Sequence, residues 1–328
     1  MISPLAGALP HSTQTRQIPS VPEATFSRLR QLCDDRHILP GNLDRIYIKP
    51  GWLAITGTNE ECGVVPFQGG RKIIGDDNSP EGRYLASLIG MPLMVLAGIR
   101  DPAAIPFRRS LKLAILSALS QPFLGCPGIR RQGWHAECWR AGDAFVQEYP
   151  VLGQVIRPDD TVAVAGYSPG VGRIREFCRE LHIIDSQADE RFGMLSIGRD
   201  RVYGPKNIRV HDPCEIAEIL GNADVIMISS SALADGSFEE IMGQIKNARL
   251  TGLFGPGASI VPDAFFSRGI DFIQSCRIVD SLKFVDDIAN DADVETALRR
   301  SQKQFLLVKG NNGTDKNGLL WPAHGQVW

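Results

Sequence analysis

The run from Thr161 to Asp185, TVAVAGYSPGVGRIREFCRELHIID, constrains the fold of this chain more than any other segment. It opens with a short apolar run rich in valine and turns at three closely spaced glycines. A helical pattern follows, and a second apolar run closes the segment. A strand, glycine-rich turn, helix and second strand form the first unit of a doubly wound parallel sheet. The turn would place backbone N–H groups at a helix start, where anionic or polar ligands are favoured.

The rest of the second half continues this alternation. Apolar runs predict further strands, and helical patterns lie between them: strands at 181–185, 224–229, 249–254 and 270–274, and helices at 171–180, 213–220, 237–247, 262–267 and 281–289. Strands that alternate with helices form a parallel sheet with right-handed crossovers. We therefore predict a Rossmann-like domain over residues 161–292, with ligands beyond the carboxyl ends of its strands.

The first half has a different pattern. Three short strand-like runs, separated by turn residues, predict a small antiparallel meander at 45–48, 52–56 and 62–67. Helices are predicted at 21–40, 82–89 and 110–119, the last of them buried and capped by Ser110. These elements make an α+β domain over 21–120. We expect a flexible leader over 1–20, a linker or insert over 121–160 and a C-terminal tail over 293–328.

Composition restricts the partners and the compartment. With 328 residues, 43% of them hydrophobic, the chain is long enough for about two globular domains. A net charge of −2 argues against a nucleic-acid partner, and the absence of a long apolar run argues against a membrane span. The seven cysteines are scattered, and the first twenty residues hold no apolar core of signal type, so we expect a cytoplasmic protein with reduced thiols.

Four blocks of the second half resemble the putative heavy-metal chelation family: GYSPGVG, NADVIMISSSALADGSFEEI, GPGASIVP and GIDFIQSCRIVD. In the first half, KPGWLAITGTNEECGVVPF and SLKLAILSAL resemble that family's partner domain, which is similar to the N-terminal domain of enolase. The resemblance implies an α/β chain in which a small α+β enolase-N-terminal-like domain precedes a Rossmann-like parallel-sheet domain. It also implies metal or small-ligand handling in the cleft between them. Ser117, Asp235 and Gly257 depart from the family pattern, which suggests a ligand of this chain's own.

The candidate ligand-binding residues occupy loops that follow predicted strands: Gly166, Tyr167, Ser168, Gly170, Gly172, Asp185, Ser229, Ser230, Ser231, Gly255 and Gly257. The N–H groups of the first turn could hold a phosphate or carboxylate, and Asp185 could accept a ribose hydroxyl of NAD or S-adenosylmethionine. The glycine spacing is not the dinucleotide fingerprint, so the alternative is that the glycines only permit tight turns. The serines could orient a ligand or merely make turn and cap hydrogen bonds, with Asp235 or Ser237 as N-cap and Glu240 in a capping box.

Catalytic and metal-binding candidates are weaker. Glu60, Glu61 and Asp235 could act as general acids or bases, and Cys276, beside Arg277, could be a reactive thiol. The alternatives are solvated turn carboxylates and a buried thiol. Thiolate and imidazole ligands suit transition metals, and two segments offer them: Cys126, His135 and Cys138 in one, His211 and Cys214 in the other. Core cysteines and surface histidines are the alternative.

The leading prediction is binding of a small polar or anionic, metal-associated ligand in the cleft between the domains, with an enzymatic step on a small metabolite. Three alternatives stay open. They are an S-adenosylmethionine- or NAD-dependent enzyme, a non-enzymatic metal-binding protein, and an interaction or oligomer scaffold. We expect a homo-oligomer. The sequence contains no Walker or HExxH pattern and no nucleophile, histidine and aspartate series of a hydrolase.

Overall fold

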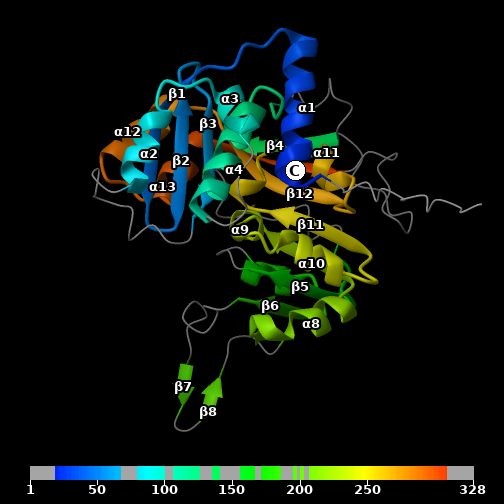
Figure 1. The fold of residues 1–328 in the computed structure, drawn as a ribbon. Helices are drawn as coiled ribbons and strands as arrows, with labels where there is room; N and C mark the ends of the chain where they lie inside the picture. The colour runs from blue at the N-terminus through cyan, green and yellow to red at the C-terminus, as the bar shows by residue number, and fades with distance from the viewer. Residues whose placement is uncertain are drawn as a thin grey trace, which may run out of the picture.

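A computed structural model gives the structure of the chain (Figure 1). It describes residues 19–67, 80–99, 106–125, 135–140, 156–166, 171–185, 195–197, 200–202 and 207–308. Within these ranges the strands form a three-stranded sheet, an eight-stranded sheet and a two-stranded hairpin. None of the described helices combines the length and the apolar character that a membrane crossing requires.

The small sheet is the predicted antiparallel meander. Its strands pair in the order β1 (Leu43–Lys49), β2 (Trp52–Gly57) and β3 (Cys62–Pro66). The turn at Gly51 takes a φ of +79°, which glycine adopts without strain. The three-stranded antiparallel arrangement is confirmed, whereas the likeness to the enolase N-terminal domain stays a prediction.

One face of this sheet packs on the N-terminal helices, which are α1 (Val21–Arg36), α2 (Pro80–Leu88), α3 (Leu93–Gly98) and α4 (Pro106–Ser120). Helix α4 lies against β2 and β3, and its leucines share one core with Leu53, Ile55 and Val65. The predicted cap at Ser110 is wrong, because the helix begins at Pro106 and Ser110 is buried within it.

The other face of the small sheet packs on helices from the far end of the chain, α12 (Ser281–Ala289) and α13 (Val294–Ser301). Ala54, Cys62 and Val64 share a core with Phe284 and Leu298. Figure 1 shows these helices to the left of β1 and β2, with α4 to the right. The predicted tail is therefore structured as far as residue 308, since it contains α13 and β13 (Gln302–Val308).

The large sheet has the order β4-β13-β12-β11-β10-β5-β6-β9. Its six parallel strands are β5 (Thr161–Ala165), β6 (Glu180–Ile184), β9 (Ile208–His211), β10 (Val225–Ser229), β11 (Leu250–Phe254) and β12 (Phe272–Ile278). Numbered along the chain from β5, they lie in the order 3-2-1-4-5-6 of the Rossmann fold. The antiparallel strands β13 and β4 (His135–Arg140) extend one edge, so the predicted insert contributes a strand.

Most of the connections are short helices, and one prediction among them is wrong. The predicted helix 171–180 is a six-residue 3₁₀ helix, η3 (Val171–Glu176). The others are η4 (Pro213–Glu215), α8 (Ile216–Asn222), α9 (Ser231–Asp235), α10 (Phe238–Gln244), η5 (Pro256–Ala258) and α11 (Asp263–Phe266). The strands β7 (Leu195–Ile197) and β8 (Asp200–Val202) form a separate hairpin.

The N-terminal elements meet the large sheet at its carboxyl edge. Helix α4 contacts α9 and η5, and strand β3 contacts the same two elements, which follow β10 and β11. Arg109 of α4 donates a hydrogen bond of 2.5 Å to the carbonyl oxygen of Asp235 at the end of α9. The two sheets therefore pack together through the segments that were predicted to bind a ligand.

Candidate functional site

The predicted ligand-binding residues form a row along the carboxyl edge of the parallel strands. Backbone hydrogen bonds connect neighbouring strand ends, from Gly166 N–H to the Ile184 carbonyl at 2.8 Å and from Asp185 N–H to the His211 carbonyl at 3.4 Å. Further along the edge, Ser230 N–H donates to the carbonyl of Phe254 at 2.7 Å. The fold thus brings together residues that are up to about ninety positions apart in the sequence.

The strand order reverses between β5 and β10. The connection after β5 passes through η3, which packs in one core with Val162 and Val164. The connection after β10 passes through α9 and α10 on the other face, in the core that contains Ile226 and Ile228. In open α/β sheets, ligands bind where the crossovers leave in opposite directions like this. The reversal therefore marks the strand ends at Gly166 and Ser229.

Two hydroxyls lie against Gly166 at this reversal. Ser229 Oγ accepts hydrogen bonds from the N–H and the hydroxyl of Ser231, at 3.3 and 2.9 Å. Gly166 has a φ of +96°, and a Cβ atom there would come within 2.5 Å of Ser229 Cβ. Glycine is therefore required for backbone conformation and for space, and it leaves the two serines packed at the strand ends.

Ser230, Gly255 and Gly257 instead hold the two sheets together. Ser230 Oγ accepts a hydrogen bond of 3.2 Å from Gly257 N–H. A Cβ atom on Gly257 would lie 3.1 Å both from Pro66 Cδ, at the end of β3, and from Ser230 Oγ. Gly255 has a φ of +106°. Close packing explains these three residues without a ligand.

The remaining members of the predicted set are less defined. Asp185 is half-buried and follows β6, and Gly172 lies in η3. Tyr167, Ser168 and Gly170 lie outside the described residues. The prediction that this turn holds a phosphate assumed a longer α-helix after it. Instead, η3 is a 3₁₀ helix of only six residues.

The carboxylate candidates differ in their surroundings. Glu61 is buried, and its Oε1 and Oε2 accept hydrogen bonds from the N–H groups of Gly41 and Asn59, at 2.6 and 2.9 Å. These hydrogen bonds stabilise the turn between β2 and β3. Glu60 is exposed on the same turn. Asp235 is also exposed, and its Oδ1 accepts from the N–H and hydroxyl of Ser237 in an Asx turn in place of the predicted capping box.

Cys276 has the character of a core residue. It is 7% exposed, and burial raises the pKa of its thiol to about 12. The pKa of Cys62, which lies near it, is raised for the same reason. A thiol that stays protonated at neutral pH is a poor nucleophile and a poor metal ligand. Of the two predictions for Cys276, a reactive thiol and a buried thiol, the geometry therefore favours the buried thiol.

The two predicted metal-binding segments lie at opposite edges of the large sheet. His135 and Cys138 belong to β4, whereas His211 ends β9 and Cys214 follows in η4. Across eight strands this separation is on the order of 30 Å. Cys126 lies outside the described residues. The hydrogen bond of Cys214 N–H runs to Asp212, and among the described residues no three His, Cys, Asp or Glu side chains gather as a metal site.

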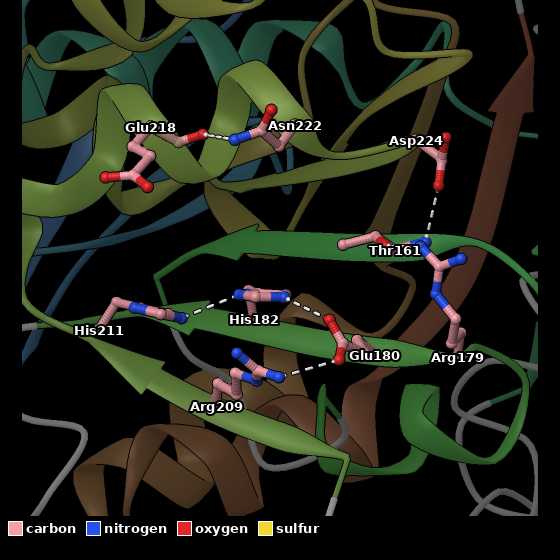
Figure 2. A network of polar contacts seen from close by, with 9 residues as sticks. All are labelled: Thr161, Arg179, Glu180, His182, Arg209, His211, Glu218, Asn222 and Asp224. Atoms are coloured by element: carbon pink, nitrogen blue, oxygen red, sulfur yellow. Dashed lines mark hydrogen bonds and ion pairs between the residues drawn. The ribbon is translucent and has the colours of Figure 1, made fainter.

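His211 does have a partner that sequence reasoning missed. Its Nε2 lies 2.9 Å from Nδ1 of His182 on β6, and Figure 2 shows His182 between His211 and Glu180. His182 stands between apolar residues of a predicted strand, so it has the sequence signature of a core residue. The signal would have been a histidine on each of two neighbouring parallel strands, but β9 was not predicted as a strand.

Comparison with known proteins agrees with this fold. One similar solved structure is a protein of unknown function from the DUF364 family of Pyrococcus horikoshii. It has 16% identity and a TM-score of 0.59, and the match covers 88% of this chain and 100% of that one. Another is a DUF364 protein of unknown function from Desulfitobacterium hafniense DCB-2, with 17% identity, a TM-score of 0.57 and coverage of 87% and 99%. No curated protein matches the chain.

A family model matches the part of the chain that contains the six parallel strands, the serines at the strand reversal, and His182 and His211. The resemblance predicted from the four sequence blocks is confirmed by this match. Residues 151–307 of the chain match the model of the DUF364 family, whose description is "Putative heavy-metal chelation".

Proposed function

We propose that this chain binds a small polar or anionic ligand at the carboxyl ends of β5, β6 and β10. The observation that carries the proposal is the reversal of strand order between β5 and β10, with Gly166, Ser229 and Ser231 packed at it. A reversal of this kind is where open α/β sheets bind their ligands. Serine hydroxyls both donate and accept hydrogen bonds, so the strand ends suit a ligand with hydroxyl or carboxylate groups.

A ribose-bearing ligand is the more specific form of the proposal. Asp185 follows the second strand of the 3-2-1-4-5-6 order, at the position where Rossmann domains accept ribose hydroxyls. Its neighbour across the edge is Gly166, whose N–H bonds to Ile184. This placement supports S-adenosylmethionine or NAD as candidate ligands. The short η3 helix argues against a site built mainly on a phosphate group.

The description of the family raises the question of a metal at the same edge. Among the described side chains, no group of three metal-ligating residues gathers there or elsewhere. The described residues therefore do not fit a metal held by several protein ligands at the reversal, and the proposal contains no step through a metal.

Thermal unfolding of the full chain tests the proposal, with S-adenosylmethionine, NAD and inorganic phosphate as separate probes. A ligand at a hundred times its Kd stabilises the folded state by about 2.7 kcal/mol. For a protein of this size each kcal/mol raises Tm by roughly 2 °C. We expect one organic probe to raise Tm by several degrees. A rise with phosphate alone would support the anion form of the proposal and contradict the ribose form.

Variants locate the effect. Asp185→Asn and Ser231→Ala should reduce the rise in Tm caused by the probe. The matched controls are Asp286→Asn on α12 and Ser267→Ala after α11, both exposed and away from the carboxyl edge. Equal responses in all four variants would contradict the proposal, as would no response of the wild type to any probe.

A further inference from the structure

The imidazoles of His182 and His211, the histidine pair, each direct one ring nitrogen at the other. His182 Nδ1 and His211 Nε2 are 2.9 Å apart, and the two ring planes differ by 11°. At this contact one nitrogen must donate and the other must accept, because only one hydrogen fits between them. Strands β6 and β9 fix the pair, since Ile184 is the register partner of His211 and Arg209 that of His182.

The outer nitrogens of the pair face carboxylates. His182 Nε2 lies 3.4 Å from Glu180 Oε2, and His211 Nδ1 lies 3.5 Å from Glu215 Oε1 (Figure 2 draws the first of these contacts). A carboxylate accepts hydrogen bonds, so it favours a hydrogen on the nitrogen that faces it. Once the shared hydrogen is removed, each inner nitrogen is the lone-pair site of a neutral imidazole. Histidines that bind metals are oriented in this way by carboxylates.

The charges around the pair favour a cation. Glu180 and Glu215 supply two negative charges, and Arg209, whose Nη2 lies 3.0 Å from Glu180 Oε1, supplies one positive charge. With neutral imidazoles, the sum of these charges is −1.

We propose that His182 Nδ1 and His211 Nε2 bind one divalent transition-metal ion of the Co²⁺, Ni²⁺, Cu²⁺ or Zn²⁺ class, which takes the place of the shared hydrogen. With metal–nitrogen bonds of about 2.0–2.1 Å, two nitrogens at a right angle are about 2.9 Å apart, and two on a tetrahedral ion about 3.3 Å. The observed separation of 2.9 Å equals the shorter of these two values. No third protein ligand gathers among the described residues, so the proposed site consists of these two imidazoles.

This site goes beyond the proposed function, because it uses neither Gly166 nor the serines at the reversal. Its test is a calorimetric titration of the metal-free full chain with Ni²⁺ and with Zn²⁺, with bound metal counted by elemental analysis. We expect one ion per chain in the wild type and loss of that ion in His182→Gln and His211→Asn. The matched control is His37→Asn, at an exposed position in the left-handed region where asparagine is tolerated.

A third variant keeps the proposal testable if the buried His182→Gln chain does not fold. Glu215 is exposed, and Glu215→Gln should weaken metal binding by about 10- to 100-fold while the thermal unfolding of the metal-free protein is unchanged. The proposal is overturned if the wild type binds neither ion, or if His211→Asn and Glu215→Gln bind as tightly as the wild type. It is also overturned if the ion is lost in His135→Asn and kept in His211→Asn.

Discussion

Gly63 is a point of close approach between β3 and α4, and we expect an alanine there to destabilise the protein. A Cβ atom on Gly63 would lie 1.9 Å from the carbonyl oxygen of Ala114 and 2.9 Å from the backbone nitrogen of Ala118. Both are backbone atoms, so no change of rotamer can relieve the contact. The strand and the helix would have to separate, and α4 would lose packing against the core it shares with Leu53 and Ile55.

The magnitude follows from two opposing effects. Overpacking of a core costs about 1–3 kcal/mol, and more where the backbone must shift. Alanine recovers about 0.4–1 kcal/mol, because it restricts the unfolded chain more than glycine does. We therefore expect Gly63→Ala to lower the free energy of unfolding by about 2 kcal/mol or more, a large share of the 5–15 kcal/mol typical of a domain.

Urea unfolding followed by circular dichroism measures this loss. With a slope of about 2 kcal/mol per molar urea, the midpoint of Gly63→Ala should fall by about 1 M. The control is Gly221→Ala in α8, where nothing lies within 4 Å of the added Cβ atom. Alanine is favoured in a helix by about 0.5–1 kcal/mol, so this midpoint should hold or rise. Equal midpoints for the two variants would refute the packing of β3 on α4.

Three further predictions concern buried and exposed side chains. Arg249 forms an ion pair with Asp160 in which the two side chains are 8% and 6% exposed, so Arg249→Met should leave an uncompensated carboxylate and cost about 3–5 kcal/mol in urea unfolding. The thiol of Cys276 has a pKa of about 12 in the folded protein, against an ordinary value of 9.0, so the free energy of unfolding should fall as pH rises from 9 towards 12. Cys276→Ala should flatten that part of the stability–pH profile, and an unchanged profile would contradict the burial. Brief treatment of the native protein with iodoacetamide should modify the exposed Cys214 and spare Cys276, as peptide mass spectrometry would show; equal labelling would count against the structure.

Local pattern was sufficient to predict five of the six parallel strands, and β9 (Ile208–His211) was missed. Each of the inner strands is a short apolar run between turn residues, and helix α12 has the predicted bounds, 281–289. The alternation of strands and helices predicts a parallel sheet with right-handed crossovers, but the order 3-2-1-4-5-6 was not predicted, because it includes β9. The three-stranded meander was equally readable, because Gly51 and the turn before β3 separate its strands.

Apart from the Ser110 cap and the helix 171–180, the missed elements depend on contacts between distant segments. Strand β13 begins with the polar residues Gln302, Lys303 and Gln304, and it is a strand because β12 and β4 pair with it on either side. Its partner β4 lies in the segment 121–160, which was predicted to be a linker or insert. Strand β4 was missed because it, too, depends on pairing with a distant strand. Helix α13 has its buried face against a sheet more than two hundred residues earlier in the chain. Nothing local to either segment contains that information.

The candidate site likewise contains residues that the sequence predicted and contacts that it did not predict. Gly166, Ser229 and Asp185 were identified from the sequence because they follow strands, and the sheet brings such positions to one edge. The contact of His182 with His211 could not be predicted, because it depends on the side-chain register of two neighbouring strands. The packing of Gly257 against Pro66 likewise depends on how the two sheets meet.

Hydrogen exchange of the backbone amides is the most direct test of the central claim, that the carboxyl edge at the strand reversal binds a ligand. Exchange would be followed by mass spectrometry in S-adenosylmethionine, in NAD and without either. The account predicts that one of these probes slows exchange in the peptides that contain Gly166, Asp185 and Ser231, and leaves α12 and α13 unchanged. Protection confined to other segments, or no protection by either probe, would contradict a ribose-binding site at this edge.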